Sequence, residues 1–329
     1  ANTASATSMS TPAARQKASS DRAAAPGARS MDLLCMDSEE SPKPSPALRA
    51  AACALIRPAL MEKDDMADEA REAMDYDVVI VGAGPAGLSA GIRLKQLAAA
   101  AGSEISVAVL EKGAEVGAHI LSGAVIDPIT LDELIPDWKA KGAPLDTPVT
   151  EDHFKVLGPA GALGLPNFLM PPLMSNHGNY IASLSNFTKW LGVEAETLGV
   201  EIYPGMAASA ALFDELGALK GVVAGVFGIA RDEHRKSDYQ PGMELHSKYV
   251  FIAEGARGSL AKTLQNRYQL TAKCDPQKYG IGIKELWEVS LAQHKPGLVL
   301  HTVGWPLDDK TGGGSFMYHW GERLVSVGY

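Results

Sequence analysis

The sequence predicts an α/β fold, mixed with α+β parts, that begins with a dinucleotide-binding β–α–β unit at residues 75–111. Three observations predict it: an apolar run typical of a buried strand, a glycine-rich turn that opens a helix, and a second strand that ends in an acid. The run is 78–81, the glycines follow it directly, and the acid is Glu111. A glycine turn alone could be a packing turn, but the complete order of these elements is the one that a dinucleotide site needs.

Each glycine of the G-x-G-x-x-G turn has an expected role. Gly82 permits the tight turn, Gly84 lets the backbone approach a pyrophosphate, and Gly87 lets the helix pack closely on the strand. The N–H groups at the start of the helix, expected at 88–101, favour phosphates together with the helix dipole. The expected cofactor contacts in this turn are Gly82, Ala83, Gly84, Pro85, Ala86, Gly87, Leu88 and Ser89.

Further cofactor contacts are expected where the second strand, 105–110, ends. Glu111 can accept hydrogen bonds from ribose hydroxyls, and an acid there suits an unphosphorylated ribose, which favours FAD or NAD over NADP. Lys112 is its neighbour. A second glycine turn at 254–259 follows another buried-strand pattern, so Gly255 is a candidate contact, although this turn can also be read as a plain strand-to-helix connection.

Composition excludes several classes of function. The 329 residues, 46% hydrophobic and 21% charged, are enough for two domains, and the net charge of −9 argues against nucleic acid as a partner. The three cysteines, Cys35, Cys53 and Cys274, are far apart and form no C-x-x-C motif. They predict neither a disulfide framework nor a zinc or iron–sulfur site, and the scattered histidines suggest no metal ligands.

Residues 1–74 differ from the rest, because they contain no Phe, Tyr or Trp and are rich in Ala, Ser and Pro. We expect a disordered or non-native N-terminal extension, apart from a short helix near 48–60. The first thirty residues are basic enough for a mitochondrial transit peptide. The acidic run 62–72 suits a cleaved presequence poorly, so a non-native extension, with the true start near Met61, Met66 or Met74, is the preferred interpretation.

No Asp, Glu, Lys or Arg occurs in 156–188. The prolines of this stretch forbid one continuous helix, and the sequence predicts no transmembrane helix. Two interpretations remain: buried loops of a large core, which the residues alone favour, or an apolar surface that enters one membrane leaflet.

Earlier in the chain, Asp127 and Pro128 predict the start of a helix, and Trp138 is expected at an amphipathic position.

From 75 to 329 the sequence closely resembles electron transfer flavoprotein–ubiquinone oxidoreductase. The glycine fingerprint at 80–89 is shared by many flavoproteins, whereas the other matching stretches are more specific and occur in family order. One is Gly-Gly-Ser-Phe-Met-Tyr-His at 313–319. The others are 117–124, 142–152, 176–180, 279–287 and 301–307.

The resemblance implies an FAD-binding Rossmann-like domain of the glutathione-reductase/hydroxylase type with an interleaved quinone-binding domain. The expected domains are 75–270 for FAD and 271–329 for the start of the quinone-binding part, which would be incomplete. The implied activity is transfer of electrons from reduced electron transfer flavoprotein to ubiquinone, where fatty acid and amino acid oxidation enter the respiratory chain. In the family, FAD and a [4Fe-4S] cluster carry these electrons. No catalytic acid, base or nucleophile is therefore nominated.

Carried over by position, the resemblance assigns 80–94 to the FAD phosphates, Glu111 to the ribose, and Gly313 and Gly314 to the quinone. It also implies a monotopic enzyme on the inner face of a bacterial cytoplasmic or mitochondrial inner membrane. The implied membrane-surface segment is 118–139. Its expected lipid-facing residues are Ile120, Leu121, Ile126 and Ile129.

The chain also departs from the family pattern. Cluster cysteines of the family would lie beyond Tyr329, and the chain ends in a strand-like pattern, so we expect an N-terminal fragment that lacks the cluster and holds FAD weakly or not at all. Two alternatives stay open. One is an FAD-dependent monooxygenase or geranylgeranyl-reductase-like enzyme, and the other is an inactive, membrane-binding fragment.

Overall fold

The computed structural model describes residues 71–329 apart from 122, 231, 233 and 309. The expectations for 1–70, including the short helix near 48–60, concern residues outside this part. Strand β1 (Glu72–Val81) begins three residues before the expected start of the folded part, because Glu72 already pairs with Met243.

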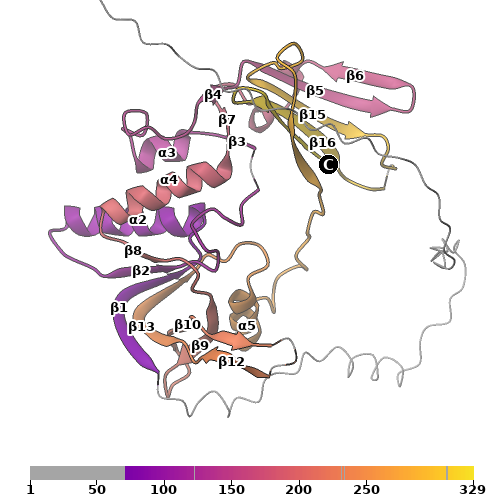
Figure 1. Cartoon of the computed structure of the whole chain (residues 1–329). Helices are drawn as coiled ribbons and strands as arrows, with labels where there is room; N and C mark the ends of the chain where they lie inside the picture. Colours follow the sequence, from indigo (N-terminus) through magenta and orange to yellow (C-terminus); the bar gives the residue numbers. More distant parts are fainter. Residues whose placement is uncertain (1–70, 122, 231, 233, 309) are drawn as a thin grey trace, which may run out of the picture. The chain divides into compact units, whose positions relative to one another are not determined.

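The first sheet has six strands in the order β8-β2-β1-β13-β10-β9 (Figure 1). β1, β2, β8 and β13 run parallel, while β10 is antiparallel to both β13 and β9. A two-stranded ribbon, β11 with β12, is separate from this sheet. The bounds are β2 (Val107–Leu110), β8 (Glu201–Tyr203), β9 (Ala208–Phe213), β10 (Leu219–Ala224), β11 (Phe227–Ile229), β12 (Arg235–Gln240) and β13 (Met243–Ile252).

Both faces of β1 are buried, because successive strand residues point to opposite sides of a sheet. Val78 and Ile80 belong to the core cluster that includes residues of helices α2 (Pro85–Ala100) and α4 (Leu184–Thr197), which lie side by side in Figure 1. Val79 and Val81 belong to the cluster that includes residues of α5 (Ser259–Arg267).

Helix α2 begins three residues before the expected position 88. Proline at the first helical position is favourable, since its missing N–H would have no partner in the first turn of a helix, and Pro85 occupies this position.

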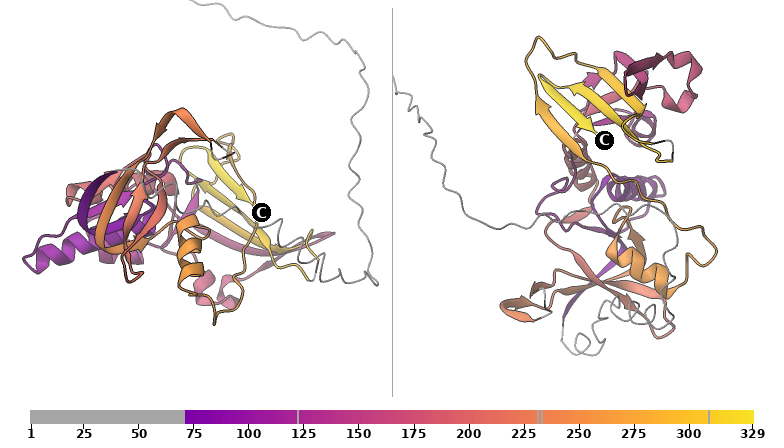
Figure 2. Two further views of the ribbon diagram at one scale, coloured as in Figure 1. Left: turned by 90° about the horizontal axis from the view of Figure 1, so that it is seen from below. Right: turned by 90° about the vertical axis from the view of Figure 1, so that its right-hand side faces the viewer.

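The second sheet also has six strands, in the order β14-β17-β16-β15-β5-β6. In both views of Figure 2 its yellow strands lie together, distinct from the sheet that holds the indigo β1. β15 runs parallel to β5, and all other neighbours are antiparallel. β5 and β6 lie within the range expected for the FAD domain, 75–270, whereas the other four strands of this sheet follow residue 271. The second sheet is therefore built from both ranges. The bounds are β5 (Glu151–Gly158), β6 (Gly161–Leu165), β14 (Lys284–Glu288), β15 (Leu298–Gly304), β16 (Gly314–Trp320) and β17 (Leu324–Gly328).

A three-stranded sheet, β3-β7-β4, packs on the second sheet, since Ile181 shares a core cluster with Val299, Tyr318 and Trp320. The remaining bounds are β3 (Ala124–Ile126), β4 (Thr147–Pro148), β7 (Tyr180–Ala182), α3 (Ile129–Leu134), η1 (Asn167–Leu169) and η2 (Pro172–Met174).

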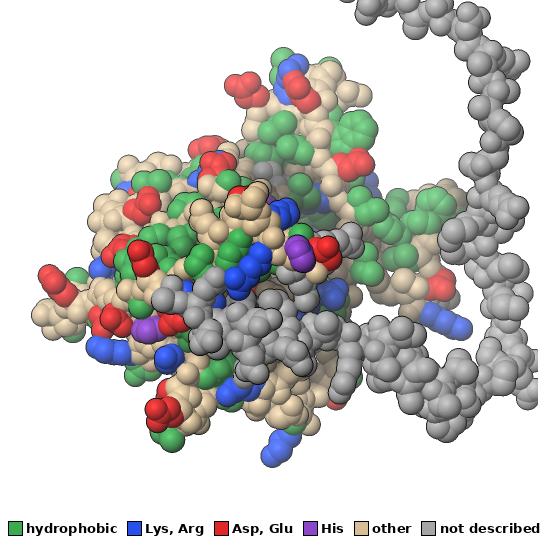
Figure 3. Space-filling view, turned by 60° about the horizontal axis from the view of Figure 1, so that its bottom comes forward, with side chains coloured by type: hydrophobic (Ala, Val, Ile, Leu, Met, Phe, Trp, Pro, Cys, Tyr) green, Lys and Arg blue, Asp and Glu red, His purple; other side chains and the backbone are tan. Residues whose placement is uncertain are grey.

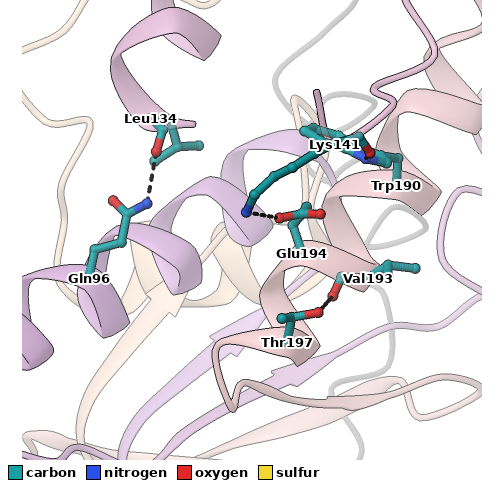
Figure 4. Close-up of polar contacts among 7 residues, drawn as sticks. All are labelled: Gln96, Leu134, Lys141, Trp190, Val193, Glu194 and Thr197. Carbon is teal, nitrogen blue, oxygen red and sulfur yellow. Dashed lines mark hydrogen bonds and ion pairs between the residues drawn. The ribbon is translucent and has the colours of Figure 1, made fainter. Parts of the chain in front are cut away.

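Polar contacts tie α3 and the turn after it to the helices of the first sheet (Figure 4). Gln96 donates to the carbonyl of Leu134 at 2.8 Å, and the Lys141 Nζ lies 2.7 Å from the Glu194 carboxylate. Trp190 donates to the Lys141 carbonyl at 3.2 Å. Trp138 is only 3% exposed: its ring packs in the core, its indole N–H donates to Asp132, and Lys139 lies over the ring, in agreement with the amphipathic position predicted for it.

Among the described residues, no helix is both long enough and apolar enough to cross a bilayer.

Candidate functional site

The first glycine turn is shaped by close backbone contacts. A Cβ on Gly82, whose φ is +110°, would lie 2.4 Å from the carbonyl oxygen of Ala253, and a Cβ on Gly87 would lie 2.0 Å from that of Gly82. Both positions therefore need glycine for the fold, as the sequence predicts for the tight turn and the close helix packing. A Cβ on Gly84 would have no atom within 4 Å, so internal packing does not require glycine there.

The start of α2 leaves backbone donors available. Gly84 is the N-cap, no side chain caps the helix, and no acid occupies its first turn. Pro85 has no N–H, and the N–H of Leu88 already donates to Gly84, so those of Ala86 and Gly87 are the donors without a partner within the helix. The positive end of the helix dipole is thus uncompensated where Gly84 leaves space.

Glu111 lies against the same turn. Its carboxylate accepts from the N–H of Ala83 at 3.2 Å and from that of Gly113 at 2.6 Å. The ribose contact predicted for Glu111 stays a prediction. It is chemically compatible with this geometry, because each carboxylate oxygen can accept a second hydrogen bond.

The second glycine turn has a different role from the first. The Glu254 carboxylate accepts from the backbone N–H of Ala261 at 2.8 Å and of Leu260 at 3.3 Å, so it caps α5. A Cβ on Gly258 would lie 2.5 Å from that carboxylate. The start of α5 is therefore satisfied by the protein itself, and the sequence analysis missed this cap; an acid four residues before a glycine that opens a helix was the available signal.

A cleft of about 860 Å³ opens between the two glycine turns. The loop at 117–120 and the segment 206–208 also contribute to its wall. Arg257, which the sequence analysis did not single out, adds a cation to it and stacks over the ring of Tyr279. Of the predicted cofactor residues, those that line the cleft are Gly82, Gly84, Pro85, Ala86, Glu111, Lys112 and Gly255.

Four predicted cofactor residues do not line this cleft. Ala83 and Leu88 are buried in the core, and Gly87 packs against β1. Ser89 lines a separate cavity of about 420 Å³ between α2 and α3. Their place in the motif follows from folding of the turn. The cofactor contacts predicted for these four residues stay predictions.

Gly313 and Gly314 lie at the start of β16, in the second sheet. A Cβ on Gly314 would lie 1.9 Å from the carbonyl of Thr302, so the strand pairing itself requires glycine there. A row of paired residues crosses the sheet from this point: Gly314 pairs with Val303, Val303 with Val156, and Val156 with Leu163. Paired residues share a face, so Val303, Val156 and Leu163 form one exposed apolar row that ends at Gly314.

The uncharged stretch 156–188, which contributes Val156 and Leu163 to this row, also holds apolar side chains that are almost fully exposed. Phe168 is 84% exposed and Leu173 is 99% exposed, and Leu163 and Leu169 are also exposed. The core interpretation of this stretch is therefore wrong for its middle part. The short helices η1 and η2, set by Pro166, Pro171 and Pro172, cannot bury these side chains within the chain.

The segment 118–139 contains both exposed residues and residues that pack on the protein. Of the four residues expected to face lipid, Leu121 and Ile129 are exposed, whereas Ile120 and Ile126 are half-buried, and Ile126 packs against the main core. Figure 3 shows exposed hydrophobic side chains in separate patches on one face of the molecule, so exposure of single residues does not define a membrane surface.

No set of three or more His, Cys, Asp or Glu side chains within the described residues could hold a metal ion. The described cysteine, Cys274, is exposed and free, while Cys35 and Cys53 lie outside the described residues.

Comparisons with known proteins agree with this geometry. A family model described as "ETF-QO, ubiquinone-binding" matches residues 279–329, and one described as an NAD(P)-binding Rossmann-like domain matches residues 80–140. The electron transfer flavoprotein-ubiquinone oxidoreductase of Pseudomonas aeruginosa is 58% identical over 260 residues, 78% of this chain and 47% of that protein. The mitochondrial protein of the same name from Mus musculus is 54% identical over 262 residues, 79% of this chain and 42% of that protein. The chain spans less than half the length of these curated relatives.

Solved structures with low sequence identity share the fold. A geranylgeranyl bacteriochlorophyll reductase-like protein from Thermoplasma acidophilum has a TM-score of 0.53 at 16% identity, covering 78% of this chain and 56% of that one. A flavoprotein/dehydrogenase from Cytophaga hutchinsonii has a TM-score of 0.50 at 16% identity, covering 78% of this chain and 55% of that one. The predicted fold class, an α/β fold with a Rossmann-like domain, is confirmed.

Proposed function

This chain is a relative of the electron transfer flavoprotein–ubiquinone oxidoreductases, and we propose that it binds FAD and takes part in passing electrons from reduced electron transfer flavoprotein to ubiquinone. The observation that carries the proposal is the cleft at the first glycine turn, in a chain 58% identical to the P. aeruginosa protein. The donor and acceptor are those in the relatives' name, and the family match at 279–329 supports ubiquinone as the acceptor.

The residues of the cleft fit FAD. Gly84 leaves its Cβ space empty, the N–H group of Ala86 is available for a diphosphate, and Glu111 can accept from the ribose. Lys112 and Arg257 are cations that line the same cleft and favour an anionic ligand. Bound FAD supplies the electron-carrying chemistry, so the side chains have the task of binding, orienting and shielding it.

The quinone is proposed to bind at the end of the apolar row, near Gly313 and Gly314. Ubiquinone has a polar head and a long apolar tail. Gly313 and Gly314 present backbone rather than side chains at the end of the row, and Val303, Val156 and Leu163 provide an apolar path for the tail. Each methylene of the tail that leaves water on this path contributes about 0.8 kcal/mol.

We also propose monotopic association with a membrane, through the exposed side chains of 163–174 rather than through 118–139. Phe168, Leu169 and Leu173 are exposed in a stretch without charged residues, and the same stretch contributes Val156 and Leu163 to the row that leads to Gly314. An apolar surface of this kind is favourable against lipid and unfavourable in water. The proposed location is the inner face of a bacterial cytoplasmic or mitochondrial inner membrane.

The [4Fe-4S] cluster implied by the resemblance has no ligand set among the described residues, where Cys274 stands alone. The proposal therefore routes no electron through a cluster in this part of the protein. The relatives are more than twice as long as the matched segment. The complete activity is therefore proposed for this chain together with the further segments that a relative of full length contains.

Anaerobic single-turnover spectroscopy tests the proposal. The chain is loaded with FAD, its flavin is photoreduced, and a short-tail ubiquinone or NADP⁺ is mixed in. We expect the quinone to restore the oxidised flavin spectrum and NADP⁺ to leave it unchanged. A reduced flavin indifferent to quinone contradicts the proposal, and rapid reaction with the nicotinamide instead favours a monooxygenase- or reductase-like enzyme.

A further inference from the structure

A buried histidine–tyrosine pair lies on the same face of the second sheet as Gly314. The Nε2 of His301 in β15 and the hydroxyl of Tyr318 in β16 are 2.8 Å apart, with the rings edge to face. Tyr318 is buried and His301 is half-buried. The hydrogen bond within such a pair can serve only to satisfy the polar atoms of the two side chains. A further role depends on where the pair lies and on whether one of its hydrogen-bond donors is left over.

The strand register places this pair beside the apolar row, two residues away from it along β15. His301 precedes Val303 by two residues, and Val303 pairs with Gly314, so about 7 Å of strand separates the His301 row from the Gly314 row. His301 pairs with Phe316, whose ring stacks on that of Tyr318 at 4.6 Å. The pair is therefore a titratable cluster close to the glycines at which the quinone head is proposed to lie.

The pair has one hydrogen-bond donor to spare. A neutral imidazole carries one N–H and a phenol carries one O–H, and the contact between them uses one of these two protons. Within the described residues, neither side chain has another hydrogen-bond partner. Whichever tautomer is present, an N–H or O–H remains without a protein partner among the described residues, and this donor can bond to a ligand or to water.

Burial favours the neutral forms of both side chains of the pair. Burial lowers the pKa of His301, an effect that the charge of Asp152 partly opposes, and burial together with that charge raises the pKa of Tyr318 to about 12. Two further charged groups of β14 lie on this face: Lys284, over the ring of Phe316, and Glu288, which forms an ion pair with Arg323. Asp152 is itself held by Asn176 through the backbone N–H and the side-chain amide.

From this arrangement, and resting on the quinone site proposed above, we propose that Tyr318 and His301 act as one unit that donates a hydrogen bond, and then a proton, to a carbonyl oxygen of the bound quinone. Reduction of a quinone to a quinol adds two electrons and two protons. Both electrons come from the reduced flavin, which is oxidised. One proton comes from the pair as its O–H or N–H bond breaks and a quinol O–H bond forms.

The remaining atoms balance through water. The second carbonyl oxygen takes its proton from water, the pair regains its lost proton from water, and the protons given up by the flavin return to solvent. No further oxidant or reductant is needed.

Single-turnover reoxidation of photoreduced flavin by ubiquinone-1 tests this role in the FAD-loaded chain. Because the pair keeps both protons, the wild-type rate should be independent of pH between about pH 7 and 9. In Tyr318→Phe the rate should fall about 10–100-fold, and it should decrease further as the pH rises, since the proton must then come from solvent. His301→Asn should behave similarly.

Matched controls separate this role from general damage. Tyr249→Phe changes an exposed tyrosine in β13, and His153→Asn changes an exposed histidine in β5, on the opposite face from Asp152. Both should keep the wild-type rate and pH profile. A Tyr318→Phe variant with the wild-type rate and a flat profile would overturn the proposal.

Infrared spectroscopy of carbonyl-labelled ubiquinone-1 gives a readout without turnover. In the oxidised wild-type protein the stretch of one carbonyl should shift to lower frequency, and in Tyr318→Phe or His301→Asn it should return toward that of free quinone. An unshifted carbonyl in the wild-type protein overturns the proposal even when the variants do not fold. Wild-type flavin that quinone fails to reoxidise would instead contradict the proposed function.

Discussion

The backbone of Gly82 passes the carbonyl of Ala253 so closely that a methyl group on Gly82 would lie 2.4 Å from its oxygen. This contact joins the first glycine turn to the end of β13, where Ala253 also donates to Val81 at 2.8 Å. The two walls of the cleft are therefore held together by main chain, and the shape of the cleft is part of the fold.

Two alanine substitutions in the same turn should separate folding from binding. Gly82→Ala adds a steric clash and forces a residue with a side chain to φ +110°, so it should lower the free energy of unfolding by about 2–4 kcal/mol. Gly84→Ala meets no protein atom and should leave the melting temperature nearly unchanged while FAD affinity falls. Calorimetry and flavin titration measure both; equal FAD affinity in Gly84→Ala and wild type contradicts the proposed diphosphate position.

Glu111→Gln should weaken FAD binding by about tenfold, because a hydrogen bond to a charged group contributes about 1.5–3 kcal/mol. It should also cost some stability, since the amide cannot accept from both Ala83 and Gly113 through its two terminal atoms. Glu115→Gln is the control, as its carboxylate pairs with Lys189 on the surface. Isothermal titration compares the FAD affinities of the two variants and the wild type. Unchanged affinity in Glu111→Gln would contradict the proposed contact between Glu111 and the ribose.

Acid stability should depend on Asp77. The hydrogen bond from Lys248, with those from Ser106, lowers the pKa of Asp77 from 3.8 to about 2. Because the folded-state pKa is depressed, the stabilisation is complete above pH 3.8 and is lost as the pH falls through about 2. Melting temperatures between these values should fall more steeply for wild type than for Asp77→Asn. Asp275→Asn, at an exposed carboxyl, should keep the wild-type slope, and an identical slope in Asp77→Asn would argue against this assignment.

Membrane association should depend on the position of exposed leucines, not on their exposure. Leu173 is 99% exposed in the uncharged stretch, and Leu216 is 95% exposed in the turn between β9 and β10. Leu173→Ser should reduce co-flotation with liposomes, most clearly when combined with Phe168→Ser, whereas Leu216→Ser should not. Equal flotation of all three variants and wild type would place the membrane contact elsewhere.

The β–α–β unit was predictable from the sequence because its signals are local. An apolar run, a glycine turn and an acid at the end of the next strand each act within a few residues, and the structure confirms the strands and the close contacts of Gly82 and Gly87. The fold class followed from this unit and from the resemblance.

The remaining features depend on contacts between distant residues. From its residues the uncharged stretch 156–188 could be core or surface, and only the three-dimensional arrangement shows that Phe168 and Leu173 are exposed. The capping role of Glu254 and the pairing of His301 with Tyr318 likewise depend on geometry that no sequence spacing specifies.

The most direct test of the account is a crystal structure of the chain grown with FAD, supported by a flavin titration of the same protein. We expect one FAD per chain, with its diphosphate within hydrogen-bond distance of the N–H group of Ala86 and its ribose at Glu111. A folded chain that takes up no FAD, or one that binds it outside the cleft between the two glycine turns, would contradict the account.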